Sequence, residues 1–142
     1  MSLTIYAYDQ LSPEFDKVYE TNLLEIRWEY AVTLDLPFPV GPPMITYAYE
    51  NRYSFKAGKF EAFRDWLEAH RFVGEDFKLL HFIDNGGKYL SWRQCAVLAE
   101  NFQRHFNMVC MYSPNEYFKR KYIKWMTATT IAAEGGAIVF DY

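Results

Sequence analysis

The sequence predicts an α+β protein with a mixed or antiparallel sheet and about three helices packed mainly on one face. Three observations lead to this prediction. Patterns typical of strands dominate the first half of the 142 residues, patterns typical of helices dominate the second half, and residues 137–142 alternate like a last strand. Separate runs of strands and helices are typical of α+β folds, whereas α/β folds alternate the two. The expected order of elements is β, β, β, α, β, α, α, β.

The chain is expected to form a single domain over residues 1–142. Its length is common for one domain, and a chain of this size buries enough surface to fold without disulfides or metal ions. No linker and no low-complexity segment divides it.

The N-terminal part is expected to supply three strands. Residues 4–9 and 45–50 have similar apolar and aromatic composition, and each is predicted to be a short strand. Between them, apolar and polar residues alternate over 24–36, a period of two that predicts a strand with one buried face. The residues expected on that buried face include Ile26, Trp28 and Tyr30.

Two further segments have clear patterns. Residues 57–70 carry apolar side chains at the spacing of an amphipathic helix. Residues 78–84 are almost continuously apolar, which predicts a strand that is buried on both faces. The residues expected on the inner side of the helix are Phe60, Phe63, Trp66 and Leu67.

A capping box predicts where the next helix begins. Ser91 is followed three residues later by Gln94, so the hydroxyl and the side-chain amide can each satisfy a free backbone N–H. The helix is expected to continue to about Phe106. Its inward residues are predicted to be Cys95, Leu98, Ala99 and Phe102.

A second capping box is predicted at Ser113, with Pro114 at the first helical position and Glu116 at the third. This helix is expected to end near Glu134, because the Gly-Gly pair at 135–136 is typical of helix C-termini.

Charge and composition exclude several classes of protein. A net charge of −3 gives no general attraction to nucleic acid or to anionic membranes. Neither a membrane-spanning apolar run nor a signal-peptide pattern is visible. The two cysteines, Cys95 and Cys110, make neither a disulfide framework nor a zinc site. We therefore expect a cytoplasmic protein without a nucleic-acid or membrane partner.

A basic cluster lies in the last predicted helix, interleaved with aromatic residues. Such a mixture can bind single-stranded nucleic acid. Helical geometry, however, places Phe118, Tyr122 and Trp125 on one side and the basic residues broadly on the other, which favours a solvated helix face. The basic residues are Lys119, Arg120, Lys121 and Lys124, and the aromatic ones are Tyr117, Phe118, Tyr122 and Trp125.

The segment from Asp84 to Gly87 is the candidate binding loop. It follows a predicted strand and precedes the helix that begins at Ser91. Glycines permit close backbone approach, and a helix N-terminus attracts anions. An ordinary turn is the alternative, because Asn-Gly and Gly-Gly are common turn dipeptides. The residues predicted to bind a ligand here are Asp84, Asn85, Gly86, Gly87 and Arg93.

The sequence contains no complete catalytic or metal-binding pattern. His70, His81 and His105 do not have the i, i+4 spacing of a metal site, and none of the familiar phosphate-loop, hydrolase or zinc patterns is present. His81 and Asp84 would point to opposite faces of one strand. We therefore expect neither a metal nor another cofactor, and catalytic residues are not assigned.

Part of the chain resembles a family of small uncharacterised proteins encoded by bacteria and phages. These share an Asp-x-x-Gly…Ser-x-x-[Glu/Gln]-Cys-Ala-x-Leu-Ala pattern and a C-terminal Gly-Gly-x-x-Val-Phe strand, which correspond here to residues 84–99 and 135–140. An aromatic segment followed by a helix, like residues 53–67, is a further similarity. The chain departs from the pattern at Asn85 and Gly86. The resemblance covers about the last two-thirds of the chain and implies no activity.

Aromatic residues make up 20% of the chain, 28 side chains in all when the 12 Tyr, 12 Phe and 4 Trp are counted together. Tyr and Trp tolerate half-burial, so some are expected at the surface in a contact patch. This favours a non-catalytic protein–protein interaction role, of an accessory or immunity type, with a protein partner or self-association. The alternative is a small enzyme or ligand-binding protein with its site at the Asp84–Gly87 loop and the following helix N-terminus. A deep polar pocket would favour the alternative, and an exposed aromatic patch the interaction role.

Overall fold

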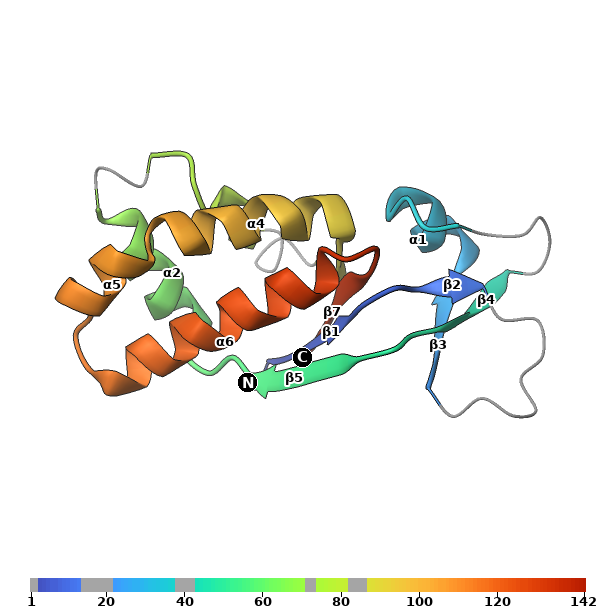
Figure 1. Cartoon of the computed structure of the whole chain (residues 1–142), viewed down its shortest axis with the longest axis horizontal. Coiled ribbons are helices and arrows are strands. Elements are labelled where there is room, and N and C mark those ends of the chain that lie inside the picture. Colours follow the sequence, from blue (N-terminus) through green and yellow to red (C-terminus); the bar gives the residue numbers. More distant parts are fainter. Residues whose placement is uncertain (1–2, 14–21, 38–42, 71–73, 82–86) are drawn as a thin grey trace.

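The structure is a computed structural model that describes residues 3–13, 22–37, 43–70, 74–81 and 87–142. These residues form an α+β fold with two antiparallel sheets, which confirms the predicted class (Figure 1). Most helices gather over a four-stranded main sheet. A small three-stranded sheet with one short helix occupies the other end of the molecule (Figure 1).

The main sheet has the strand order β5-β1-β7-β6. Its strands are β5 (Arg52–Lys56), β1 (Thr4–Tyr8), β7 (Ala137–Asp141) and β6 (Tyr89–Ser91). In β1, Ile5 lies in register between Phe55 and Phe140, and all three are buried under the helices. The strands predicted at 4–9 and 137–142 are thus confirmed, whereas the sequence pattern does not predict β5 and β6.

The small sheet has the order β2-β4-β3. Its strands are β2 (Ser12–Pro13), β4 (Met44–Ala48) and β3 (Leu23–Arg27). The chain crosses between the two sheets twice, from β1 to β2 and from β4 to β5. The strand predicted at 45–50 corresponds to β4.

The two crossings are tied together by Asp9 and Asn51. The buried Asp9 carboxylate accepts hydrogen bonds from the backbone N–H of Asn51 at 2.7 Å and from its side-chain amide at 2.9 Å. The backbone N–H of Asp9 donates to the Asn51 carbonyl at 3.2 Å. These three bonds join segments that are 42 residues apart in the chain.

The turn before β7 closes the same region. Gly135 has a φ of +69°, the left-handed conformation that ends helices. At Gly136, a Cβ atom would lie 1.7 Å from the carbonyl oxygen of Tyr8, so this position accepts only glycine without movement of the backbone. Gln10 and Leu11 donate backbone hydrogen bonds to Glu134 and Gly135.

In the part of the chain that the structure describes, four α-helices and one 3₁₀ turn accompany the main sheet. The helices are α2 (Phe60–Glu68), α4 (Trp92–Arg104), α5 (Phe106–Tyr112) and α6 (Glu116–Ala132), and the 3₁₀ turn is η2 (Lys78–Leu80). Helices α4 and α6 lie side by side over the sheet (Figure 1). The helix predicted over 57–70 is confirmed as α2. The inward residues predicted for α4 are all buried.

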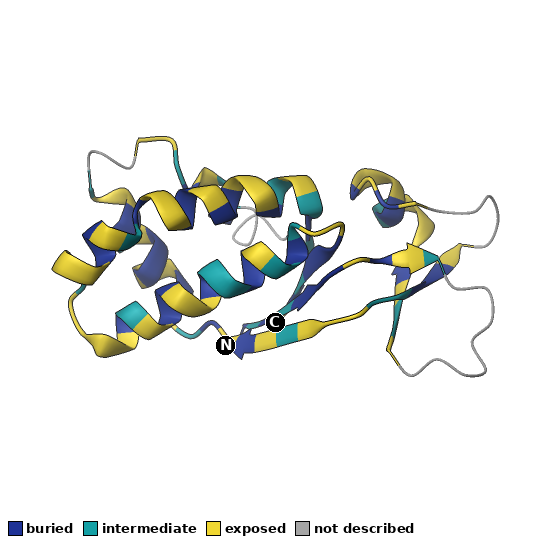
Figure 2. Cartoon of the chain, in the orientation of Figure 1, coloured by how far each residue is buried: buried dark blue, intermediate teal, exposed yellow. Residues whose placement is uncertain are grey.

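The core beneath these helices is rich in aromatic rings. Trp125 and Tyr122 of α6 are completely buried, as is Phe102 of α4, and buried residues line the inner sides of the helices (Figure 2). Phe102 and Tyr122 meet edge to face with ring centroids 5.0 Å apart, and the Tyr122 hydroxyl donates to the carbonyl of Phe102. Much of the aromatic surplus is therefore accounted for by this core.

The capping prediction is confirmed at Ser91 and wrong at Ser113. The Ser91 hydroxyl accepts from the backbone N–H of Gln94 at 3.2 Å, and the Gln94 side chain accepts from the Ser91 N–H at 2.9 Å. The N-cap of α6 is instead Asn115, whose side chain accepts from Phe118 at 2.8 Å. Asn caps helices as well as Ser does, so α6 begins two residues later than predicted, and Ser113 is the C-cap of α5.

The long strand predicted over 24–36 is also wrong. It ends at Arg27, and residues Trp28–Thr33 form the helix α1. Thirteen residues would extend about 40 Å at roughly 3.3 Å each, whereas the partner strand β4 offers only five residues to pair with. Ile26 is buried as expected, but Trp28 is 42% exposed.

The strand predicted over 78–84 is contradicted where the structure describes it. Lys78–Leu80 form η2, which begins after Phe77 in a left-handed conformation with a φ of +72°. Leu80 is buried, so the apolar character of the segment reflects burial rather than pairing. His81 follows the turn and does not lie on a strand.

The two serines make a matched test of helix capping. We expect Ser91→Ala to lower the free energy of unfolding by roughly 0.5–2 kcal/mol, because the backbone N–H of Gln94 loses its hydrogen-bond partner. Ser113→Ala should change it by less than about 0.5 kcal/mol. Urea denaturation measures both, and equal losses from the two substitutions would contradict the assignment.

Candidate functional site

Helix α1 sits on the small sheet and divides its side chains between the interior and the surface. The N–H of Trp28 donates to the Pro43 carbonyl at 2.7 Å, which fixes where the helix leaves β3. Ala31 and Leu34 are buried. Because residues four apart share a helix face, Trp28 and Val32 lie together on the side away from the small-sheet core.

Three large apolar side chains at this end of the molecule are exposed. Trp28 is 42%, Val32 45% and Met44 41% exposed. Met44 is paired with Arg27, the residue before Trp28, so β4 and α1 bring the three to the same end of the small sheet. Arg27 also forms an ion pair with Glu29 at 2.9 Å beside them. We call the three apolar residues the α1 patch.

A cavity of about 440 Å³ lies on the other side of α1, between that helix and the start of α4. Two tyrosines form part of its wall, with ring centroids of Tyr30 and Tyr89 5.1 Å apart. Burial, and to a smaller degree the neighbouring Tyr30, raises the pKa of Tyr89. The described residues that line it are Tyr30, Thr33, Leu34, Gly87, Lys88, Tyr89, Ser91, Arg93 and Gln94.

Two of the five residues predicted to bind a ligand line this cavity. They are Gly87 and Arg93, whereas Asp84, Asn85 and Gly86 lie outside the described residues. The Gly87 carbonyl accepts a hydrogen bond from the Tyr142 hydroxyl at 3.3 Å. Gly87 and the start of α4 thus border the same cavity.

Arg93 is already engaged by the protein. Its Nε donates to Oδ2 of Asp35 at 2.8 Å, and its guanidinium stacks on Trp92 with the carbon 4.4 Å from the ring centroid. The Trp92 ring nitrogen donates to the Asp35 carbonyl at 3.2 Å. Asp35 therefore joins the end of α1 to the start of α4 and holds Arg93, one of the residues that line the cavity.

The histidines are all used in local contacts elsewhere. His70 bonds to the Trp66 carbonyl at 2.8 Å, and His81 to Glu68 at 2.5 Å. His105 bonds to Asp76 at 2.8 Å. Burial raises the pKa of the Asp76 carboxyl, but hydrogen bonds from His105 and Arg104 outweigh this and hold it below its usual value. No group of three or more His, Cys, Asp or Glu side chains suited to a metal ion occurs in the described part of the chain.

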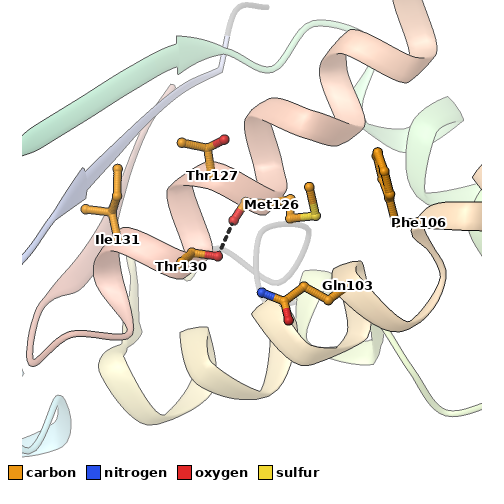
Figure 3. Close-up of a pocket in the computed structure, with 6 residues that line it drawn as sticks. All are labelled: Gln103, Phe106, Met126, Thr127, Thr130 and Ile131. Carbon is orange, nitrogen blue, oxygen red and sulfur yellow. Dashed lines mark hydrogen bonds between the residues drawn. The ribbon is translucent and has the colours of Figure 1, made fainter. Parts of the chain in front are cut away.

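A second cavity of about 440 Å³ is an open groove between α6 and the α4–α5 junction (Figure 3). Phe106, Met126 and Ile131 give it apolar walls. The Thr130 hydroxyl, which lies in the groove, donates to the Met126 carbonyl at 2.8 Å (Figure 3). The groove has no charged side chain among its described lining residues, so it is not suited to acid–base chemistry.

The basic cluster of α6 does not form one solvated face, which corrects the sequence interpretation. Arg120 and Lys124 are exposed, whereas Lys121 is only 7% exposed. The three aromatic residues predicted to face inward, Phe118, Tyr122 and Trp125, are buried.

No family model, curated protein or solved structure matches this chain. Among the helices that the structure describes, none is long and apolar enough to cross a bilayer.

The alternation pattern does not predict that the side chains of the α1 patch are exposed. The same spacing that predicts a buried strand face places Trp28 and Val32 at i, i+4 of a helix, and the two interpretations give opposite exposure. The length of the alternating segment is the feature of the sequence that argues against a single strand, because a strand of 13 residues is longer than most.

The contact between Arg93 and Asp35 can be tested for its contribution to stability. Both side chains are more than half exposed. We expect Arg93→Ala to lower the free energy of unfolding by about 1 kcal/mol or less, as is usual for exposed ion pairs. Urea denaturation measures the change, and a loss above about 3 kcal/mol would show that the pair is essential to the fold.

Proposed function

We propose that this protein acts without catalysis, by binding another protein chain through the α1 patch in an accessory or immunity-type role. The observation that carries the proposal is the exposure of Trp28, Val32 and Met44 at one end of the small sheet. A second copy of the chain is one possible partner, which the mass of the complex identifies.

The composition of the patch supports this role. Trp, Met and Arg are enriched in the centres of protein interfaces, and truncation of a central Trp often costs about 2 kcal/mol or more in binding. The Arg27–Glu29 ion pair supplies the charged rim that commonly surrounds such a centre. The backbone of Trp28 is fixed by its hydrogen bond to Pro43, so little backbone freedom is lost at this position on binding.

The placement of α1 also supports an interaction role. The helix is anchored from behind by Ala31 and Leu34 and from its end by the contacts of Asp35. A rigid anchored helix presents its outer side in one conformation. Such preorganisation raises affinity because the ordering has already taken place.

The alternative is a ligand-binding protein or small enzyme centred on the cavity lined by Gly87 and Arg93. Its support is that two predicted site residues meet there. Against it, the Arg93 side chain bonds to Asp35, and the lining contains no carboxylate among the described residues. We therefore favour the interaction role.

Nucleic acid is not proposed as a partner. The net charge is −3, and one of the four basic residues clustered on α6 is buried.

A cytoplasmic location is proposed as well. Both cysteines are free, and the buried Cys95 thiol has a pKa well above its usual value because burial disfavours the thiolate.

Two valines allow a matched test. Val32 lies in the α1 patch and is 45% exposed, and Val97 lies on α4 and is 49% exposed. A photo-cross-linking amino acid is placed at either position and activated in the cells that naturally produce the protein. We expect a discrete cross-linked adduct from position 32 and none from position 97. Mass spectrometry then identifies the protein that is cross-linked at position 32.

Truncation of Trp28 then links the adduct to the patch. Trp28→Ala should weaken the association by about 30-fold, the equivalent of roughly 2 kcal/mol, and abolish the adduct at position 32. Tyr112→Ala, which removes a ring that is 61% exposed on α5, should leave it unchanged. Equal adducts from positions 32 and 97, or an adduct that survives Trp28→Ala, would argue against this surface.

A further inference from the structure

A third cavity lies far from the α1 patch, where the N-terminal turns of α6 meet α2. Its volume is about 280 Å³, enough for a small organic molecule. We call it the Lys121 pocket. The described residues that line it are Gly58, Lys59, Ala62, Phe63, Trp66, Pro114, Asn115, Tyr117, Phe118 and Lys121.

The Lys121 pocket has aromatic walls. The rings of Trp66 and Phe118 lie 4.5 Å apart between centroids, and those of Phe63 and Phe118 lie 5.0 Å apart. Trp66 is only partly buried, so part of its ring remains available to the cavity. Stacked and tilted rings of this kind suit a planar apolar group.

The Lys121 ammonium, which lies in the pocket lining, is buried without an acidic partner among the described residues. Lys121 is only 7% exposed, which is rare for a lysine. Its Nζ donates to the carbonyl of Lys56 at 2.9 Å and lies 4.8 Å from the centroid of the Tyr117 ring. No carboxylate pairs with it in the part of the chain that the structure describes. An ammonium has three N–H donors, so donor capacity remains.

The surroundings of this ammonium are positively charged. The described lining includes a second lysine, Lys59, and no acidic residue. Interaction with Lys121, through hydrogen bonding and charge, lowers the pKa of Tyr117, and Lys59 and Lys124 add to the effect. A buried charge without a counter-ion is costly, and a bound anion would relieve that cost.

We propose that the Lys121 pocket binds a small aromatic carboxylate, with the carboxylate on the Lys121 ammonium and the ring between Trp66 and Tyr117. The site is separate from the α1 patch and does not depend on the role proposed for it. The same chemistry occurs in free aromatic acids and in the C-terminus of a chain that ends in an aromatic residue.

Three probes of one shape separate charge from apolar burial. Indole-3-acetate carries the carboxylate, indole-3-acetamide is its neutral analogue, and tryptamine is cationic. We expect the acetate to bind about tenfold more tightly than the amide, because a charge-assisted hydrogen bond is stronger than a neutral one. Tryptamine should not bind. Isothermal titration calorimetry on the wild-type chain measures all three, so this comparison needs no variant.

Two lysines on the same helix supply the matched variants. Lys121→Met keeps the length of the side chain and removes its charge, and it should abolish the preference for the acetate over the amide. Lys124→Met removes an exposed charge one turn away and should change the affinity for the acetate by less than about threefold, because exposed charges are screened. Lys121→Arg should retain the preference, and thermal denaturation shows whether each variant is folded.

The source of the carboxylate follows from two further probes, N-acetylphenylalanine and phenylacetate. N-acetylphenylalanine imitates a chain end, and it binds at least as tightly as phenylacetate if chain ends are the ligand but more weakly if free acids are. Either order supports the pocket. Equal affinity for the indole acetate and its amide, no binding of the acetate up to about 10 mM, or equal effects of Lys121→Met and Lys124→Met would overturn the proposal.

Discussion

The arrangement of this molecule depends on the hydrogen bonds between Asp9 and Asn51. Both segments that cross from the main sheet to the small sheet pass through this point, so the pair fixes the angle between the sheets. Asp9 is buried, and a buried carboxylate that lost its partners would cost about 1–3 kcal/mol or more. Everything at the small-sheet end, including the α1 patch and the cavity behind it, is positioned by this junction.

The surrounding backbone reinforces the junction. The close approach of Gly136 to Tyr8 leaves no room for a side chain, and the bonds from Gln10 and Leu11 bind the crossing segment to the turn after α6. The aromatic core holds α6 against the main sheet, and α6 thereby fixes the position of the turn that follows it. The helical layer thereby stabilises a small sheet whose strand β2 has only two residues.

Local signals in the sequence predict the elements that local chemistry determines. The capping box at Ser91 and the inner side of α4 follow from side chains within one or two turns, and the α+β class follows from their order. The α1 patch and the Lys121 pocket do not, because they depend on contacts distant in sequence. Nothing local indicates that Lys121 meets the carbonyl of Lys56, or that β4 stops the strand at Arg27. Alternation predicts a buried Trp28 on a strand, and the helix that forms instead exposes this side chain together with Val32.

Hydrogen exchange in an Asp9→Ala variant, which removes both hydrogen bonds that the carboxylate accepts from Asn51, tests most directly whether this junction holds the small sheet in place. The account predicts that the amides of Ile45 and Tyr47 in β4 lose protection by about tenfold or more, since the small sheet opens locally, while Ile138 in β7 keeps its protection. Asn22→Ala, which removes an exposed side-chain amide directly before β3, should affect neither. Unchanged protection in β4, or an equal loss in β4 and β7, would contradict the account.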